Sequence, residues 1–393
     1  MPPKPDVAWR DGVFAVLTAG DLPGRLVGRR LKDMPVLAQQ TVRFIGERVA
    51  VVAAQTREIA DEALSRIVVD YEEMKSVHDP IEAMAAEAPI LHANLRSYEI
   101  LRLPLPDTPN VHSHVEWLFG DIAQGFQESE LIFEQTFTTP RVHHGYLEPH
   151  AAVVDIEASG RILVWCPAKG PYVTRSHLAE WLDLPEEKIC FQITPVGGDF
   201  GGKASLMDIP LCYSLAKATG RPVKMIMSYN EELTAANPRH PALITIKSGL
   251  KRDGRLWARE VKVIFNSGAY ASFKPGDPPN LGGATFTNGV YHIPNYSIRS
   301  YGVYTNSVPC GYYRAPDQPQ AVFAAESHMD LIAKELGMDP LELRLINYTD
   351  VNPDSGKPYS SKALRECYLQ GAEKFGWAKR NPEPRSMRDG DWL

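Results

Sequence analysis

The sequence predicts an α+β fold in which strand-like and helical segments are mixed along the chain. Hydrophobic residues make up 44% of the 393 residues, which is enough to bury a sizeable core. At typical domain sizes this length corresponds to roughly two to three domains. Short apolar runs typical of strands are interspersed with segments whose apolar residues recur at helical spacing. No internal repeat or low-complexity stretch interrupts this pattern.

The first hundred residues predict a strand, a helix and a second strand. Residues 49–54 (VAVVAA) and 67–71 (IVVDY) are apolar runs typical of strands. Between them, residues 57–67 carry four apolar side chains on one helical face: Ala60, Ala63, Leu64 and Ile67. Residues 101–112 then combine three prolines with polar residues, which indicates a linker or domain edge.

The longer remainder of the chain predicts further strands and helices. Strands are expected at residues 138–156, 162–166 and 188–194. Helices are expected at three ranges, the first with an apolar stripe and the others followed by a glycine at the C-terminal cap: 172–182 (Leu178, Trp181, Leu182), 206–219 (Gly220) and 318–336 (Gly337). The last helix has one apolar face: Val322, Ala325, Met329, Ile332 and Leu336. Residues 252–254 (RDG) separate two strand-like runs and predict a hairpin.

Residues 197–203 read GGDFGGK and form the sharpest local feature of the sequence. Glycines let backbone N–H groups approach a ligand without interference from a Cβ atom. A glycine-rich loop that enters a helix forms a cradle for an anion. A plain strand-to-helix turn is the simpler interpretation, but four glycines among residues 197–202 exceed what one turn requires.

A nucleotide-binding P-loop is one functional interpretation of this segment. Gly197, Gly202 and Lys203 fit the pattern G-x-x-x-x-G-K. The motif then requires Ser or Thr, whose hydroxyl binds Mg²⁺, whereas Ala204 cannot coordinate a metal. No hydrophobic strand that ends in the completing aspartate is evident. A nucleotide-binding enzyme therefore stays an alternative that lacks its metal ligands.

The loop also resembles the GGGFGGK loop of the molybdenum hydroxylases, which include xanthine dehydrogenases, aldehyde oxidoreductases and nicotinate dehydrogenase. Further segments resemble the same family in the same order: residues 12–22 (GVFAVLTAGDL), 42–54, 68–71, 144–150 (HGYLEPH), 311–320 (GYYRAPDQPQ) and 336–340. The resemblance covers nearly the whole chain. It predicts a partial a/b hammerhead domain at residues 1–100, followed by a first molybdopterin-binding α+β domain at residues 113–393, truncated or completed by another chain.

The resemblance implies which residues hold the cofactor. Backbone groups of Phe200 and Gly201, with Gly198 in the same loop, are expected beside the molybdenum. Tyr313 and Arg314 are expected to contact the pterin through their backbone, which places Phe200 and Arg314 nearest the metal. Backbone N–H donors suit this cofactor because its oxo, sulfido and dithiolene groups are acceptors. A surface salt bridge is the simpler interpretation of Arg314.

Lys169 stands where the family often has a glutamine whose amide bonds a molybdenum oxygen. Lysine donates hydrogen bonds and cannot accept them. It also adds positive charge near an anionic site. We therefore expect Lys169 to act as a donor to the cofactor, with a solvated loop lysine as the alternative.

Three other departures bear on the substrate. Purine-hydroxylating members carry a glutamate directly after the loop lysine and an aromatic residue two positions after the loop arginine; these positions are Ala204 and Pro316. Carbon monoxide dehydrogenases carry a copper-binding cysteine directly after that arginine, where this chain has Ala315. The expected reaction is therefore hydroxylation of an aldehyde or an N-heteroaromatic carbon, with water as the oxygen source.

The resemblance also implies that essential parts lie outside the chain. The family's glutamate base belongs to the second half of the subunit, so no catalytic residue is expected here. The ending Asp391-Trp392-Leu393 and the short start indicate a split or truncated subunit. The expected cofactor is molybdenum–molybdopterin in its cytosine dinucleotide form. Expected partners are the second half and subunits with [2Fe–2S] and FAD, without which the chain is inactive; an inactive fragment is the alternative.

Composition limits the remaining classes. The net charge of −6 argues against nucleic acid as a partner. No apolar run approaches the ~20 residues that span a bilayer, and no signal peptide is evident. The five cysteines are widely spaced, which argues against zinc or iron–sulfur ligands and fits a reducing compartment. We expect a cytoplasmic protein that binds no membrane.

His144, Glu148 and His150 allow one more interpretation, a metal site. In a strand, alternate residues share a face, so these three side chains would lie together. His143 lies next to them. However, the segment resembles a structural part of the family, and no second ligand cluster stands out. We therefore expect no metal bound directly by these side chains.

Overall fold

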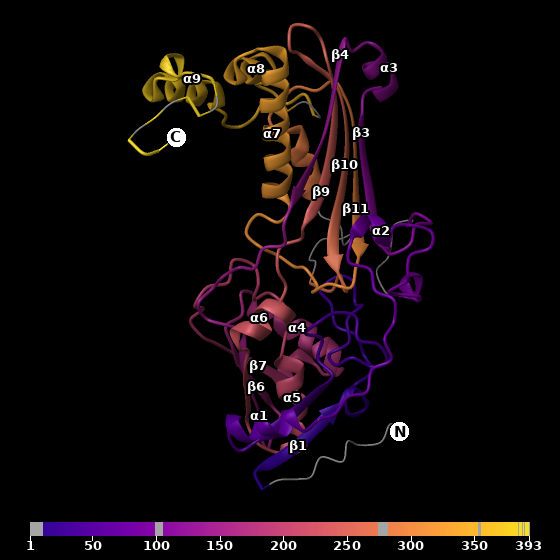
Figure 1. Cartoon of the computed structure of the whole chain (residues 1–393). Coiled ribbons are helices and arrows are strands. Elements are labelled where there is room, and N and C mark those ends of the chain that lie inside the picture. The colour runs from indigo at the N-terminus through magenta and orange to yellow at the C-terminus, as the bar shows by residue number, and fades with distance from the viewer. Residues whose placement is uncertain are drawn as a thin grey trace.

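The computed structural model describes residues 11–98, 105–273, 282–352, 355–383, 385–386, 388 and 390–392. The molecule is elongated, with a long five-stranded sheet at one end and a four-stranded sheet at the other (Figure 1). A two-stranded ribbon lies beside the smaller sheet. Helices flank both sheets, and most strand pairs are antiparallel. The predicted α+β fold is confirmed.

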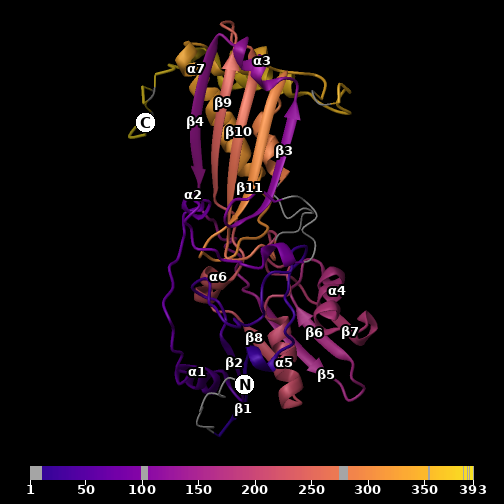
Figure 2. The ribbon, with the colours of Figure 1, turned by 90° about the vertical axis from the view of Figure 1, so that its right-hand side faces the viewer.

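The long sheet has the strand order β3-β11-β10-β9-β4. Its strands are β3 (Val111–Phe119), β4 (Leu131–Thr139), β9 (Ala242–Leu250), β10 (Leu256–Gly268) and β11 (Asn295–Tyr304). Only β10 and β11 run parallel in this order. Helix α7 (Gln318–Leu336) covers one face of the sheet (Figure 2). Ile246, Val261 and Phe265 of the sheet form the core with Met329 and Ile332 of the helix.

Two predictions in this part can be compared directly with the structure. The hairpin at 252–254 is confirmed, because Lys251 N donates to Arg255 O at 2.9 Å. The bounds of α7 are also as predicted, and Gly337 ends it with a φ of 61°. The predicted apolar face is wrong at Val322, whose side chain is 42% exposed. The buried face is displaced because small side chains lie against the sheet: Ala321, Ala324 and Ala325.

The smaller sheet has the order β7-β6-β5-β8, with β6 and β7 parallel. Its strands are β5 (Ala151–Ile156), β6 (Ile162–Cys166), β7 (Ile189–Ile193) and β8 (Val223–Ile226). Helices α4 (Pro171–Leu182) and α5 (Ile209–Thr219) pack on it, as expected near those positions. Gly220 ends α5 in the left-handed conformation, as predicted. Leu178, Trp181 and Cys212 are buried among the strands' Val154 and Val164.

The N-terminal part is tied to the smaller sheet through α5. Strands β1 (Val13–Thr18) and β2 (Ala50–Ala54) pair antiparallel, and α1 (Arg57–Ser65) follows. Leu211 and Leu215 of α5 pack against this ribbon. The strand predicted at 67–71 is wrong, since the chain there is irregular and Val68 is 83% exposed. Of the predicted face of α1 only Ala63 is fully buried.

The remaining elements are short or peripheral. The helices are α2 (Pro80–Ala83), α3 (Ile122–Gln127), α6 (Tyr229–Ala235), α8 (Pro340–Ile346) and α9 (Leu364–Phe375). The 3-10 turns are η1 (Ala19–Asp21), η2 (Leu95–Ser97), η3 (Glu186–Lys188), η4 (Gly282–Asn288) and η5 (Trp377–Lys379). Within the described ranges, no helix combines the length and apolar character needed to cross a bilayer.

Two predicted connections differ from expectation. Of the linker predicted at 101–112, residues 101–104 lie outside the described residues, 105–110 have no regular secondary structure, and 111–112 begin β3. The strand predicted at 138–156 is wrong in its middle, because residues 140–150 are an irregular crossover from β4 to β5. This crossover leads from the long sheet to the smaller one and lies where the two sheets meet.

Candidate functional site

Three loops meet at the junction of the two sheets, in the middle of the molecule in Figure 1. They are the crossover 140–150, the glycine loop 197–203 after β7, and the arginine loop 311–317 before α7. Arg314 N donates to Phe200 O at 2.7 Å, which joins the glycine loop to the arginine loop. His144 Nε2 lies 2.6 Å from Tyr312 O, which joins the crossover to the arginine loop.

The glycines allow the loops to approach closely. Gly198 and Gly201 have φ angles of 101° and 109°, which side-chain-bearing residues rarely adopt. A Cβ atom on Gly201 would lie 2.9 Å from Tyr312 O, and one on Gly198 would lie 2.8 Å from Tyr146 Cβ. Phe200 between them also has a positive φ of 47°, and its ring is half exposed. Such strain persists only where surrounding contacts fix it, and it concentrates at functional sites.

The Asp199 side chain makes hydrogen bonds within the glycine loop. Its Oδ2 accepts a hydrogen bond from Gly201 N at 2.6 Å, and its Oδ1 accepts one from Lys203 N at 2.8 Å. The cradle expected for an external anion is therefore partly filled by the protein's own carboxylate. Lys169 lies beside it: its backbone N donates to Lys203 O at 2.9 Å, and its Nζ is 3.9 Å from Asp199 Oδ2.

The Lys203 side chain points into the protein and not toward the exposed side of the glycine loop. Its side chain is 1% exposed, with Nζ 2.5 Å from Glu148 Oε2 and 5.0 Å from the centre of the Tyr146 ring. Burial acts to raise the pKa of Glu148, but the hydrogen bonds from Lys203 and Gly197 N hold it below its usual value. A P-loop lysine must reach a phosphate at the start of a helix. Here the lysine is buried and α5 begins only at Ile209, so the nucleotide-binding alternative is not favoured.

The buried carboxylate of Glu232 holds the crossover 140–150 in place. Glu232 lies in α6, which begins with a capping box between Ser228 and Glu231. It is fully buried and accepts hydrogen bonds from Tyr146 OH at 2.9 Å and from His150 N. Its Oε1 also lies 3.0 Å from His150 Nδ1. Burial acts to raise the pKa of Glu232, yet the histidine hydrogen bonds hold it well below its usual value. The carboxylate therefore stays charged and fixes the crossover.

The arginine loop is held by a second charged side chain. Arg239 Nη2 donates to Arg314 O at 2.8 Å, and the guanidinium stacks 4.5 Å from the centre of the Tyr313 ring. Ala315 and Asp317 both have positive φ angles, of 54° and 66°. The loop is therefore held in a strained conformation by contacts from outside it.

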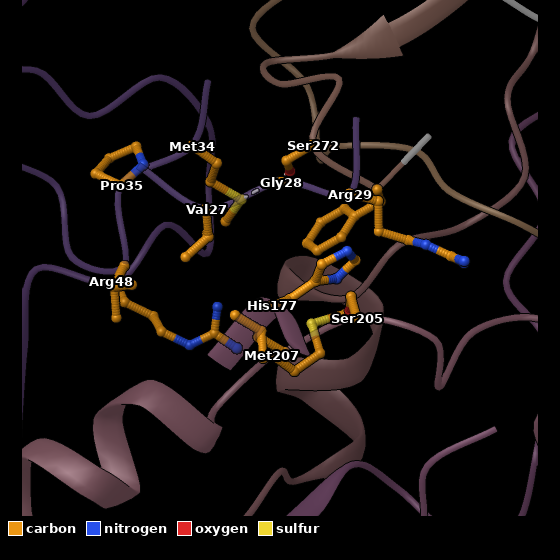
Figure 3. Close-up of a pocket in the computed structure, with 13 residues that line it drawn as sticks. Val27, Gly28, Arg29, Met34, Pro35, Arg48, His177, Ser205, Met207 and Ser272 are labelled. Carbon is orange, nitrogen blue, oxygen red and sulfur yellow. Dashed lines mark hydrogen bonds between the residues drawn. The ribbon is translucent and has the colours of Figure 1, made fainter. Parts of the chain in front are cut away.

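A small cavity lies behind the glycine loop, between residues 27–36 and residues 205–207 (Figure 3). Its volume is about 30 Å³, which is room for a water molecule and not for a substrate. Ser205 Oγ lines it and has no hydrogen-bond partner among the described residues. The Phe200 ring is exposed and leaves its side of the loop open.

The six predicted cofactor residues come together at this junction. Phe200, Gly198 and Gly201 form one wall, and Tyr313 and Arg314 form the adjoining wall. Lys169 borders the glycine loop through its bond to Lys203 O. The exposed Arg314 side chain has no hydrogen-bond or ion-pair partner within the described ranges. The positions of the six residues are thus compatible with one shared ligand.

The predicted alignment of His144, Glu148 and His150 on one face is wrong because their segment is an irregular loop. Each of the two histidines instead has a protein partner, Tyr312 O for His144 and Glu232 for His150. Burial lowers the pKa of His144 to about 4, so its Nε2 carries the proton given to Tyr312 O. No cluster of three or more His, Cys, Asp or Glu suited to a metal occurs among the described residues.

Sequence reasoning missed the supporting residues Glu232 and Arg239. The spacing Ser228-x-x-Glu231 signals a helix start and so places Glu232 in a first turn. Nothing in the sequence signals that this carboxylate is buried against His150. Arg239 follows α6 in an irregular segment, and its contacts with the arginine loop have no local signal.

Two family models match different parts of the chain. Residues 105–348 match the model of a molybdopterin cofactor-binding domain, and residues 6–75 match that of the aldehyde oxidase and xanthine dehydrogenase a/b hammerhead domain. The chain is 36% identical to a probable xanthine dehydrogenase subunit of Bacillus subtilis, over 92% of the chain and 49% of that protein. It is 34% identical to the nicotinate dehydrogenase large molybdopterin subunit of Eubacterium barkeri, over 86% of the chain and 76% of that protein.

The fold also matches solved structures. The aldehyde oxidoreductase of Desulfovibrio gigas aligns with a TM-score of 0.82 and 29% identity, over 94% of this chain and 40% of that one. Quinoline 2-oxidoreductase of Pseudomonas putida 86 aligns with a TM-score of 0.83 and 27% identity, over 95% of this chain and 49% of that one. The chain thus spans about half the length of the Bacillus relative and of the second of these structures.

Proposed function

The chain belongs to the molybdopterin cofactor-binding family of aldehyde oxidases and xanthine dehydrogenases, and from this we propose that it supplies the first half of the cofactor site in a molybdenum hydroxylase. The observation that carries the proposal is the hydrogen bond from Arg314 N to Phe200 O. It joins the two motifs that the sequence places far apart. Both loops have strained backbones at this contact, at Phe200 and Ala315.

The exposed groups of the two loops fit the cofactor. Among the described residues, no hydrogen bond engages Phe200 N, and the Arg314 guanidinium and Lys169 ammonium are exposed donors. The two neighbouring carboxylates are hydrogen-bonded within the protein, Asp199 by backbone N–H groups and Glu148 Oε2 by Lys203. A ligand on the open side therefore meets donors and positive charge. This suits a group with phosphate, oxo and dithiolene acceptors.

Each of the six candidate cofactor residues has a role in this proposal. Phe200 offers its backbone N–H to the cofactor. Arg314 offers its exposed guanidinium, because its backbone N and O are already bonded to Phe200 O and Arg239 Nη2. Gly198 and Gly201 let the loop approach the cofactor. Tyr313 stacks on Arg239 and fixes the arginine loop. Lys169 donates a hydrogen bond from the side of the loop. When bound, the molybdenum cofactor supplies hydroxylation at an electron-poor carbon, and two electrons leave the substrate.

We propose an aldehyde or an N-heteroaromatic compound as the substrate, with water as the oxygen source. Ala204 and Pro316 provide neither the charge nor the aromatic face that purine-hydroxylating relatives carry. A site without buried polar partners discriminates between substrates mainly by apolar contact, which is worth only about 1–3 kcal/mol per methylene. Benzaldehyde or nicotinate should therefore be turned over with a higher kcat/KM than xanthine.

The remaining parts of the enzyme are proposed outside this chain. They are a second half with the glutamate base and contacts to a cytosine dinucleotide form of the cofactor, and partner subunits that carry [2Fe–2S] and FAD. Within the chain, we propose a partial hammerhead domain at 1–100 and the first molybdopterin-binding domain at 113–393. We propose that the assembly works in the cytoplasm and that the chain alone is inactive.

The test is reconstitution of the enzyme. The chain is co-expressed with a matching second half and the electron-transfer subunits, and dye-linked oxidation of benzaldehyde, nicotinate and xanthine is measured. Activity that requires both halves and molybdenum supports the proposal. Activity of the chain alone, unchanged by the second half, contradicts it, as does xanthine as the best substrate by kcat/KM.

A further inference from the structure

Two departures from the family's loop pattern lie side by side in the structure. Asp199 occupies a position where the resembling loop GGGFGGK has glycine, and Lys169 occupies the position of the family's glutamine. Lys169 Nζ is 3.9 Å from Asp199 Oδ2, although 30 residues separate them in the sequence. The two replacements therefore introduce opposite charges at one place.

Asp199 is fixed much more firmly than Lys169. Its side chain is 16% exposed and accepts two backbone hydrogen bonds, from Gly201 N and Lys203 N. The Lys169 side chain is 58% exposed, but its backbone is held by Lys203 O. A long lysine side chain has many conformers, and a fixed carboxylate nearby favours those in which the ammonium stays beside it. The Asp199 carboxylate therefore restricts the conformers of the Lys169 side chain, whereas Lys169 has little effect on the position of the carboxylate.

The pair also matters for charge. A carboxylate at the edge of an anion-binding loop repels an anionic ligand unless a cation lies next to it. Lys169 supplies that cation, and it lies directly before the N-terminus of α4, which is also positive. The Asp199 carboxylate can therefore close the loop without making the open side negative.

We propose that Asp199 is a positioning residue that holds the glycine loop in shape and keeps the Lys169 ammonium at the cofactor's edge, so that the two residues act as one unit. The inference rests on the proposed function for the identity of the ligand. It goes further in assigning a role to Asp199, and in making Lys169 depend on it. If Asp199 were only a loop-closing residue, replacing Lys169 would have the same effect with or without it.

A double-mutant cycle tests this dependence. The variants are K169Q, D199N and K169Q/D199N, in the complex with the matching second half, and K217Q serves as a control that removes an exposed charge from α5. Molybdenum retained per chain after gel filtration, and KM separately from kcat, are measured. We expect K169Q to lower retention several-fold, because Asp199 then faces the anionic ligand alone. The double variant should lose less retention than the two single effects multiplied together, with a coupling of about twofold to fivefold. K217Q should have no effect.

A second measurement does not need the cofactor. Hydrogen exchange of residues 196–205 in the chain without cofactor should become faster in D199N and stay unchanged in K169Q. Effects of K169Q and D199N on retention that simply multiply, or loop exchange unaffected by D199N, would overturn the inference. A wild-type complex without molybdenum would contradict the proposed function and the cofactor part of the inference, whereas the exchange result would still decide whether Asp199 holds the loop.

Discussion

At the scale of single residues, the junction depends on glycines, which have no side chain, as much as on charged side chains. Gly201 lies against the carbonyl of Tyr312, and its φ of 109° is one that residues with a Cβ rarely adopt. Arg314 N then reaches Phe200 O. Charged side chains complete the arrangement: buried Lys203 pairs with Glu148 at the glycine loop, and buried Glu232 pairs with His150 in the crossover. Each of these contacts can be tested by one substitution.

Replacing Gly201 by alanine should separate the two loops. The added Cβ meets backbone atoms of Tyr312, which cannot move without the arginine loop, and the φ angle is unfavourable for alanine. We expect the free energy of unfolding to fall by about 1–3 kcal/mol in urea denaturation, and molybdenum retention in the complex to be lost. G371A is the matched control, since Gly371 lies in α9 with open space around it and should gain about 0.5–1 kcal/mol. Equal behaviour of the two variants would refute the close-contact explanation.

Replacing Glu232 by glutamine should loosen the crossover. The variant keeps the shape of the side chain but removes the buried negative charge that Tyr146 and His150 contact. We expect a loss of about 2–3 kcal/mol in the free energy of unfolding. The neighbouring substitution E231Q affects only the exposed capping box and should cost about 1 kcal/mol or less. If E232Q lowers the free energy of unfolding no more than E231Q does, the Glu232 carboxylate does not stabilise the crossover.

At the scale of elements, the structure separates what local sequence can predict from what it cannot. Helix α7 and the β9–β10 hairpin carry their own periodicity, glycine caps and turn residues, so their positions were predictable. Residues 67–71 do not form the predicted strand, because an apolar run does not reveal whether a neighbouring strand exists to pair with it.

The same distinction applies to the candidate site. Its two loops were predictable because each carries a short motif, GGDFGGK or GYYRAPDQPQ. Glu232 was not, because its partner His150 lies 82 residues away and only the tertiary fold brings them together. Arg239 is likewise separated from Arg314 by 75 residues.

The segment that precedes β2 offers a prediction on pH. Asp33 is buried beside the end of β11 and accepts hydrogen bonds from Tyr304 OH at 2.6 Å and Ala271 N at 2.7 Å. Burial outweighs these bonds and raises the pKa of Asp33 from 3.8 to about 7. The folded chain thus binds this proton more tightly than the unfolded chain. Its contribution to stability is fully present below about pH 4 and is lost as pH rises to about 7.

The D33N variant should lack this contribution. Urea denaturation from pH 4 to pH 8 should show the wild type losing stability relative to D33N, at about 1.4 kcal/mol for each unit of pKa difference. The exposed Asp61 of α1 provides the control, because D61N changes the same charge without burial. Parallel pH profiles for wild type and D33N would show that Asp33 does not bind a proton in this range.

At the scale of the whole molecule, two sheets and their helices bring three loops to one junction, and the chain spans about half the length of its Bacillus relative. The open side of the junction, marked by the exposed Phe200 ring and Arg314 side chain, is where we expect the cofactor and the second half to meet. In the proposed function, the candidate site is one wall of a larger one. Electron transfer should likewise depend on other subunits.

The visible spectrum of the purified chain tests whether the electron-transfer cofactors lie on other subunits. Its five cysteines are free, and Cys212 and Cys310 are buried in separate parts of the fold. A [2Fe–2S] cluster needs four protein ligands close together. We expect the chain to show neither an iron–sulfur nor a flavin absorption band, and the complete complex to show both. A stoichiometric band in the chain alone would place electron transfer within it.

We propose that the glycine and arginine loops together hold a molybdenum–pterin cofactor. The decisive measurement is the molybdenum and pterin content of the chain co-purified with its matching second half, determined by elemental analysis and by fluorescence of the oxidised pterin. We expect about one molybdenum and one pterin per complex, and loss of both in G201A under conditions where the two halves still associate. Stoichiometric molybdenum and pterin in the G201A complex, or none in the wild-type complex, would show that the two loops do not hold the cofactor in this way.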